Sequence, residues 1–257
     1  MTLHWKDLDP DHALLAALDA AGPRPESGSS DKRNWGKRFA DSCAVMIADA
    51  MRAESTFAGL EIRPNEDGSG QESLTGVGGR GTKKVDVIAS TLASGLQVAV
   101  SLKAENFAWQ GTFGKNLTNR LYELQDEVRA IHEYQPKAYV VGVFFLPTWA
   151  SMDRPDRSSF ARTVAKLRAR TGRLDSGLSS HLNRLDWSVV ALYQAEDDEL
   201  DIRRGVVRYF DVRTAPPASG RPKVNTTIDL ASAINKIARD YARDAGEIFE
   251  YADPEPD

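Results

Sequence analysis

Two neighbouring segments of the chain alternate apolar and polar residues in the way typical of β-strands. They cover residues 83–88 and 96–103, and a short connection joins them. Successive side chains of a strand point to opposite faces, so Ser101 and Lys103 should share one face of the second strand. The opposite face is expected to carry Leu96, Val98, Val100 and Leu102. A hairpin through the connection would bring Asp86 close to Ser101 and Lys103.

Apolar residues recur at helical spacing in several other parts of the chain. The helices predicted from this spacing cover residues 9–22, 35–53, 116–134, 158–171 and 230–249. Further strands are predicted near 138–146, 187–194 and 205–212, and loops at 22–34 and 65–82. Helix, strands, helix and strand follow one another over 35–146, which is typical of an α/β fold with a mixed central sheet and helices on both faces.

The length of 257 residues suits one domain with additions at its edges. We expect an N-terminal helix and linker over 1–34, with that helix as an appendage, and an α/β core over 35–150. A C-terminal α/β elaboration of the same domain should cover 151–252, with an acidic tail at 253–257.

Composition narrows the class of protein. A hydrophobic content of 41% with 27% charged residues is ordinary for a globular protein, and no apolar run approaches the length of a membrane span. The N-terminus lacks a signal-peptide pattern, and the single Cys43 fits a reducing compartment. These features predict a cytoplasmic protein with no membrane partner. The net charge of −4 argues against indiscriminate coating of nucleic acid.

The acid, hydroxyl and lysine of the predicted hairpin resemble the active-site pattern of the PD-(D/E)xK nuclease superfamily, the fold of many restriction endonucleases. Val85 stands where a proline often precedes the acid, and Ser101 stands where the second carboxylate is usual. Ser101-Leu102-Lys103 is similar to a Ser-x-Lys variant, and the run through Asn106-Phe107 is similar to a set of uncharacterised bacterial restriction-endonuclease-like proteins.

The resemblance implies a restriction-endonuclease-like fold and a DNA endonuclease that uses Mg²⁺, with Mn²⁺ as an alternative ion. Asp86 would be the principal metal ligand, the Leu102 carbonyl a neutral ligand, and Lys103 a positive charge beside the attacking water. In the Ser-x-Lys variant a glutamate on the following helix supplies the missing carboxylate. Glu123 is the best candidate for that role because it lies off the apolar stripe of the helix.

Other acids remain open as metal ligands. Asp126 and Glu127 are less well placed than Glu123 on the helix pattern, Glu105 lies two residues beyond Lys103, and Glu72 lies in the glycine-rich loop. A plain alternative is that Asp86 and Lys103 form a surface cross-strand ion pair with no function. Another is a nuclease fold that has lost its metal site.

Candidate DNA contacts fall in three places. Arg80, Lys83 and Lys84 belong to the glycine-rich loop beside Asp86, where a simple flexible loop is the plainer reading. Arg120 precedes Glu123 on the predicted helix and could contact a phosphate. The remaining candidates repeat every four residues on the basic helix, where a solvated face is the alternative: Arg162, Lys166 and Arg170.

The sequence therefore predicts a magnesium-dependent DNA endonuclease acting in bacterial restriction or phage defence. A homodimer and a defence-system partner subunit are expected from the same resemblance. The alternatives are a catalytically inactive DNA-binding or protein-interaction module, and an RNA or single-strand nuclease. Trp109 and Phe113 are expected in the core, and the scattered histidines show no zinc-type spacing.

Overall fold

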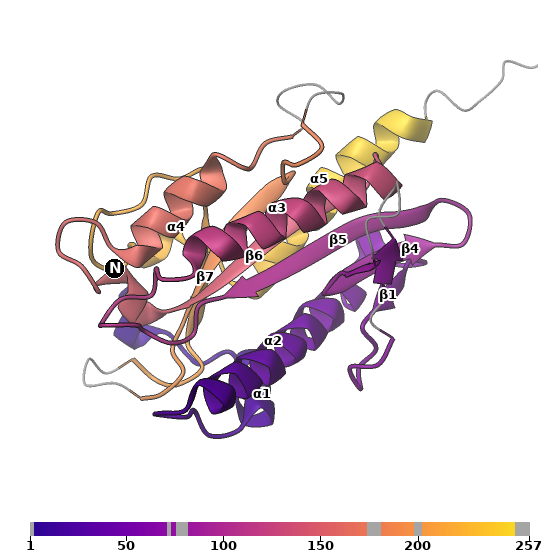
Figure 1. Cartoon of the computed structure of the whole chain (residues 1–257). Helices are drawn as coiled ribbons and strands as arrows, with labels where there is room; N and C mark the ends of the chain where they lie inside the picture. Colours follow the sequence, from indigo (N-terminus) through magenta and orange to yellow (C-terminus); the bar gives the residue numbers. More distant parts are fainter. Residues whose placement is uncertain (1–2, 71–72, 76–81, 174–180, 198–201, 250–257) are drawn as a thin grey trace, which may run out of the picture.

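The computed structural model describes residues 3–70, 73–75, 82–173, 181–197 and 202–249. Over these residues the chain is an α/β protein built on an open, mixed, six-stranded sheet with the strand order β1-β4-β5-β6-β7-β8 (Figure 1). The strands of this sheet are β1 (Glu61–Arg63), β4 (Val87–Thr91), β5 (Gly95–Ala104), β6 (Tyr139–Pro147), β7 (Trp187–Tyr193) and β8 (Val207–Asp211). β4 is antiparallel to both of its neighbours, β1 and β5, whereas β5, β6 and β7 are parallel, and β8 returns antiparallel to β7.

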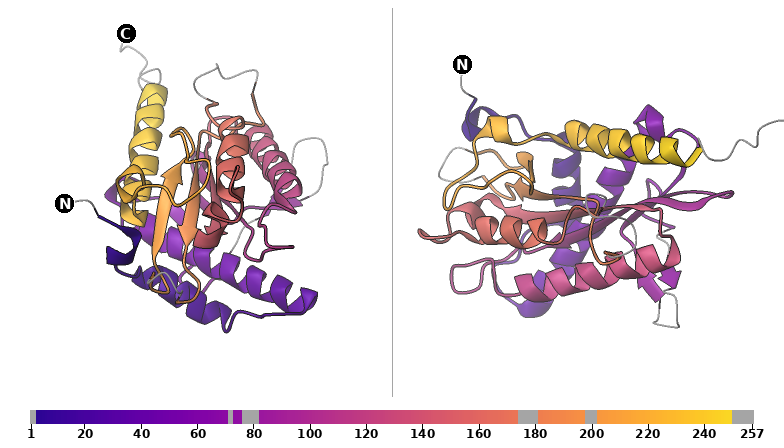
Figure 2. Two further views of the ribbon diagram at one scale, coloured as in Figure 1. Left: turned by 90° about the vertical axis from the view of Figure 1, so that its left-hand side faces the viewer. Right: turned by 90° about the horizontal axis from the view of Figure 1, so that it is seen from above.

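Helices cover both faces of the sheet, as the sequence predicts (Figure 2). One face packs against α1 (His12–Ala21), α2 (Ser29–Arg52) and α5 (Leu230–Phe249). The other face packs against α3 (Leu117–Tyr134) and α4 (Ser159–Arg168). β6 is buried along its whole length because it is covered on both sides.

A hairpin is present as β4 and β5, but its first strand is shifted: β4 begins at Val87, so the predicted strand 83–88 overlaps it only at Val87 and Ile88, and residues 82–84 belong to a different sheet. One side-chain assignment within the hairpin is also wrong. Val87 pairs with Val100 and Ala89 with Val98, after which the register shifts so that Ser90 pairs with Leu96. This β-bulge inserts an extra residue into β5, so the side chains before it point to the opposite face of the sheet from the one that the alternation predicts. Leu96 therefore packs with the α3 side of the sheet, whereas Val98, Val100 and Leu102 pack with the α2 side.

The N-terminal region differs from the prediction. α2 begins at Ser29, six residues before the predicted start, so half of the predicted linker is helical. The polar first turns of this helix gave no apolar periodicity in the sequence, since they bury no side chain before Trp35. α1 is not an appendage: Leu14, Leu18 and Ala21 are buried in the same core as α2.

The predicted loop before the hairpin also contains structure. β2 (Ser73–Thr75) and β3 (Thr82–Lys84) form a separate two-stranded antiparallel sheet. The tripeptide strands are too short to show alternation clearly, which is why the glycine-rich sequence predicts only a loop. After β3 ends at Lys84, the chain continues through Val85 and Asp86 into β4, so Asp86 directly precedes the first residue of β4.

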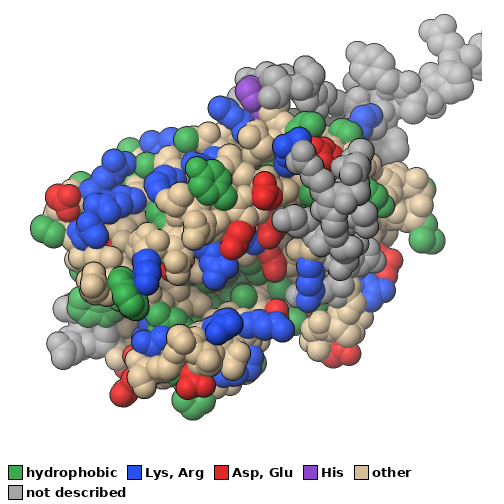
Figure 3. All heavy atoms as spheres, in the orientation of Figure 1, with side chains coloured by type: hydrophobic (Ala, Val, Ile, Leu, Met, Phe, Trp, Pro, Cys, Tyr) green, Lys and Arg blue, Asp and Glu red, His purple; other side chains and the backbone are tan. Residues whose placement is uncertain are grey.

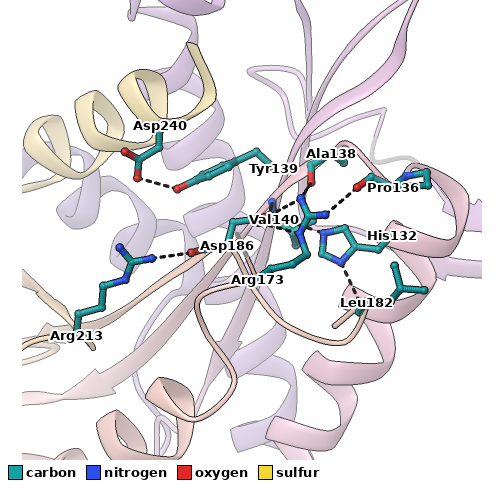
Figure 4. Close-up of polar contacts among 10 residues, drawn as sticks. All are labelled: His132, Pro136, Ala138, Tyr139, Val140, Arg173, Leu182, Asp186, Arg213 and Asp240. Atoms are coloured by element: carbon teal, nitrogen blue, oxygen red, sulfur yellow. Dashed lines mark hydrogen bonds and ion pairs between the residues drawn. The ribbon is translucent and has the colours of Figure 1, made fainter. Parts of the chain in front are cut away.

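A buried polar cluster fastens the start of β6 and β7 to the segment that follows α4 (Figure 4). Asp186 accepts a hydrogen bond from Arg173 Nε at 2.8 Å and one from Val140 N at 2.7 Å. Arg173 also donates to the carbonyls of Pro136 and Ala138 at 2.8 and 3.2 Å. His132 Nδ1 donates to the Leu182 carbonyl at 2.8 Å. The side chains of His132, Arg173 and Asp186 are all buried, which indicates a structural role for the cluster.

Candidate active site

The candidate site lies where β5 extends beyond its partner β4. The pairing of the two strands ends at Val87 and Val100, so the last residues of β5 have no strand on that side. Asp86 fills the first of these open positions, because its Oδ2 accepts a hydrogen bond from Leu102 N at 2.7 Å. An extended backbone directs the N–H and C=O of one residue to the same edge, so the Leu102 carbonyl also faces this open side. Asp86 and the Leu102 carbonyl are therefore brought together, as the resemblance implies for two metal ligands.

The second half of the site joins β5 to α3. Lys103 Nζ lies 2.8 Å from both carboxylate oxygens of Glu127 and 3.4 Å from Ser101 Oγ. Ser101 in turn donates its hydroxyl proton to Glu127 Oε2. The side chains of Lys103 and Glu127 are 10% and 15% exposed, so this is a largely desolvated pair and not a surface one. Ser101 and Lys103 do share one face of β5, as the alternation predicts.

The carboxylate that joins this site is Glu127, one helical turn beyond the predicted Glu123. Glu123 is 51% exposed and pairs with Arg120 at 3.0 Å. The register of α3 against β5 decides this: the helix runs antiparallel to the strand, with Glu127 opposite Ser101 and Arg120 opposite Glu105. Asp126 is exposed on α3 and takes no part, and Glu72 lies outside the described residues. The helical pattern thus predicted the helix whose acid contacts Ser101 and Lys103, but that acid lies one turn beyond the predicted residue.

The environment of Asp86 opposes its ionisation. Burial is the main cause of the raised pKa of its carboxyl group, and Glu127 and Asp41 raise it further. Lys103 and the hydrogen bond from Leu102 act in the opposite direction. Two acids that repel each other beside a lysine form the kind of environment that is common at functional sites, since a bound cation would relieve the repulsion.

The donors at this site suit magnesium in kind. Carboxylate and carbonyl oxygens from Asp86, Glu127 and Leu102 are hard ligands of the type that Mg²⁺ prefers. Both Glu127 oxygens are engaged by Lys103, so this carboxylate would have to share its charge between the lysine and a metal. Within the described residues, no group of three or more His, Cys, Asp or Glu side chains is placed to hold a metal ion. These residues therefore fit a magnesium site that has few anionic ligands and a modest affinity for the ion.

A basic cleft of about 700 Å³ opens beside the site, at the N-terminal ends of α2 and α3 (Figure 3). Its wall includes Lys103, which thus belongs to both the cluster and the cleft. The cations that line it are Lys32, Arg33, Lys37, Lys103, Lys115 and Arg120. Three of them come from α2 and were not singled out in the sequence, two because they fall in the predicted linker. Lys37 follows Arg33 by four residues and Lys32 by five, so a helix through this segment would place all three cations on one side. This spacing is the signal that could have identified them.

The predicted DNA contacts are only partly gathered at this cleft. Arg120 lines it, whereas Arg80 and the side chain of Lys83 lie outside the described residues. Lys84 is exposed and lines a different hollow, between α1 and α2, together with four acids. The predicted basic stripe lies off the cleft, and Arg170 falls beyond the end of α4. Lys166 Nζ donates to Thr118 Oγ1 of α3 at 2.9 Å, and Arg170 donates to the Lys166 carbonyl. Arg162, at the start of the stripe, is half-buried.

Glu105 is a buried acid at the same cleft. Its side chain is 9% exposed, its nearest cation is Arg120 Nε at 4.0 Å, and its Oε1 has no hydrogen-bond partner among the described residues. Burial raises the pKa of Glu105 from 4.5 to about 7. The negative charge of Glu123 raises it as well, whereas the positive charge of Arg120 lowers it.

This shift makes the stability of the protein depend on pH. The folded state binds the Glu105 proton more tightly than the unfolded chain, so the contribution of Glu105 to stability is fully present below about pH 4.5 and is lost as the pH rises through about 7. The loss amounts to about 3 kcal/mol. We expect Glu105→Gln to raise the free energy of unfolding above pH 7 and to leave it unchanged below pH 4.5, as measured by urea unfolding across this range. An equal effect at both ends of the range would contradict this ionisation.

No protein-family model, curated protein or solved structure matches this chain. Of the helices described, none is long and apolar enough to cross a membrane.

Proposed function

We propose that the protein is a magnesium-dependent DNA endonuclease of restriction-endonuclease-like fold that hydrolyses phosphodiester bonds. The observation that carries this proposal is the convergence of Asp86, Lys103 and Glu127 at the open edge of β5, beside a cleft lined by basic residues. A surface ion pair between Asp86 and Lys103 is disfavoured, because Lys103 pairs with Glu127 in a largely buried position and Asp86 is half-buried.

The order of elements supports the same proposal. α2 is followed by the antiparallel strands β1, β4 and β5, then by α3, and then by β6 parallel to β5. This is the order of helix, strands, helix and strand that the sequence predicts around the residues of the resemblance. β7, β8, α4 and α5 extend this unit and bury their apolar residues in the same two cores.

The chain's own residues have distinct roles in the proposed reaction. Asp86 and Glu127 would hold the ion, with the Leu102 carbonyl as a neutral ligand. When bound, Mg²⁺ lowers the pKa of its water and offsets the charge that develops on the phosphate. Lys103 holds a positive charge where the attacking water would lie, and Ser101 fixes the orientation of Glu127 through its hydroxyl. The cations of the cleft neutralise the phosphates of the substrate.

Digestion assays test the proposal directly. Circular duplex DNA, single-stranded DNA and RNA are incubated with the protein in the presence of Mg²⁺, Mn²⁺ or a chelator. We expect linearisation of the circular duplex with either metal and none with the chelator. Cleavage of RNA alone would identify a ribonuclease, and metal-independent cleavage would contradict the proposed chemistry.

Two glutamate variants test which turn of α3 supplies the second carboxylate of the proposed metal site. We expect Glu127→Gln to weaken Mg²⁺ binding by about 10-fold or more and to reduce cleavage accordingly, because it removes one of the two carboxylates of the site. Glu123→Gln is the matched control: it lies on the same helix, and its carboxylate is exposed. Isothermal calorimetry and the digestion assay measure both effects. Equal losses in the two variants would contradict the assignment to Glu127.

The second candidate function is a non-catalytic DNA-binding module on the same fold. It is favoured by one observation: Lys103 and Ser101 already satisfy Glu127, whereas Asp86 forms no ion pair among the described residues. Such a module would bind DNA equally well with and without Mg²⁺ and would show no heat of metal binding. Action in bacterial restriction or phage defence, a homodimeric state and a defence-system partner subunit remain part of the proposal, and sedimentation of the protein with and without DNA tests the dimer.

A further inference from the structure

One large aromatic side chain of the cleft is exposed although the sequence predicts it in the core. Trp109 is 55% exposed, whereas Phe113, four residues later, is buried as expected. Trp109 and Thr112 exchange backbone hydrogen bonds of 2.7 and 3.0 Å across a tight turn. The two central residues of that turn, Gln110 and Gly111, have positive φ angles of 47° and 76°. This turn fixes the Trp109 backbone, so the indole is a pre-ordered surface rather than a loose loop side chain.

The surroundings of Trp109 suit an anionic partner. Lys115 Nζ lies 3.2 Å from the centre of the indole ring. The cations Lys32, Arg33 and Lys37 of α2 form no ion pair with any described acid, so their charges are available to a ligand. The first turns of α2 and α3 also meet the cleft, and neither helix has a side-chain cap at its N-terminus. Backbone N–H groups and lysines around an aromatic ring are the features that bind the backbone and bases of a nucleic acid strand.

Glu105 supplies the second, independent indication of a ligand. It is the one acid that lines the described cleft, and its buried Oε1 accepts no hydrogen bond from the described residues. A buried acceptor without a donor costs stability, so a ligand that brings an N–H group to this oxygen would recover that cost. The exocyclic amino groups of cytosine and adenine are donors of this kind, and carboxylates accept from cytosine N4. Thymine has no exocyclic amino group.

We propose that the cleft binds an unpaired segment of DNA, with one base stacked on Trp109 and the amino group of a base donated to Glu105. This rests on the proposed function in one respect, since it takes the substrate of that site to be DNA and specifies that the DNA presents an unpaired nucleotide to the cleft. The cleft volume of about 700 Å³ is in the range of pockets that enclose one small organic ligand. A base can enter such a pocket only when it is free of its duplex stack. The cations along the cleft then hold the adjoining phosphates.

Binding is measured by fluorescence anisotropy of labelled short oligonucleotides in the presence of a chelator, so that no cleavage occurs. We expect oligodeoxycytidine to bind about 5-fold or more tightly than oligodeoxythymidine. Trp109→Ala should weaken the binding of both about 10-fold or more, and Trp109→Phe should restore most of it. Trp149→Ala is the matched control, because Trp149 is 46% exposed but lies outside the lining of the cleft. Glu105→Met should remove the preference for cytosine, so that oligodeoxycytidine and oligodeoxythymidine bind with equal affinity.

Three results would overturn the inference: equal weakening by Trp109→Ala and Trp149→Ala, duplex binding as tight as single-strand binding, or a cytosine preference that survives in Glu105→Met. The outcome is separable from that of the nuclease proposal. Oligonucleotide binding without any metal-dependent cleavage would count against the nuclease alone. Cleavage of DNA with no effect of Trp109 on binding would count against the unpaired-base site alone.

Discussion

Replacing Asp86 by asparagine should reduce the rate of metal-dependent cleavage by at least about 100-fold. The protein should stay folded and become no less stable. The asparagine oxygen can still accept the hydrogen bond from Leu102 N, so the local backbone is retained. The negative charge that would hold the metal is lost. Because burial and Glu127 raise the pKa of Asp86, its ionised form is disfavoured in the folded state, and removing that charge relieves a cost. We therefore expect an equal or higher melting temperature at neutral pH together with loss of activity.

This combination separates a functional carboxylate from a structural one. If Asp86 only caps the end of the β4–β5 ladder, Asp86→Asn would change neither cleavage nor Mg²⁺ binding. Asp126→Asn is the matched control, because Asp126 is an exposed acid of α3. Lys103→Met should also abolish cleavage, but here the melting temperature should fall, since Glu127 loses the cation that compensates its burial. Full activity in either Asp86→Asn or Lys103→Met would overturn the active-site assignment.

Replacing Arg173 by methionine should lower the free energy of unfolding by about 3–5 kcal/mol. Arg173 is 3% exposed and Asp186 is fully buried, so methionine would leave a buried carboxylate without its cation. The carbonyls of Pro136 and Ala138 would lose donors as well. Methionine keeps most of the apolar stem, so the effect reports the lost charge and hydrogen bonds more than lost packing. Urea unfolding followed by circular dichroism measures this change.

A matched control and a rescue sharpen this test. Arg129→Met makes the same substitution at a half-exposed arginine of α3 that pairs with Glu133. It should lower the free energy of unfolding by less than about 0.5 kcal/mol. The double variant Arg173→Met with Asp186→Asn should recover part of the loss, because asparagine can still accept from Val140 N without carrying a charge. A loss in Arg173→Met no larger than that in Arg129→Met would contradict the structural role of the cluster.

Most of the framework was predictable from the sequence because its elements have strong local signals. α3 and α5 bury one apolar stripe each, and their spacing gives both helices to within a residue at each end. β6 is a continuous apolar run that ends at Pro147, which predicts a strand covered on both faces. The elements without such a signal were missed: the first two turns of α2 are solvated, and β2 and β3 are three residues each.

The position of Leu96 shows where local pattern fails within a correctly predicted element. The alternation from Leu96 to Leu102 is regular in the sequence, yet the bulge opposite Ala89 and Ser90 places Leu96 on the other face. A bulge is set by how two strands are paired, and nothing in one strand alone encodes it.

The sequence by itself determined that Asp86 would lie beside the segment from Ser101 to Lys103, because a hairpin and the period of a strand are local geometry. Only the tertiary structure decided which acid joins them and which cations face them. The choice of Glu127 over Glu123 depends on the register of α3 against β5, and a shift of one helical turn would reverse it. The basic cleft depends on the N-terminal turns of α2 and α3 meeting at the free edge of β5, although 88 residues separate their first residues, Ser29 and Leu117, along the chain. Such contacts between distant segments follow from packing of the whole core, which no local pattern of residues specifies.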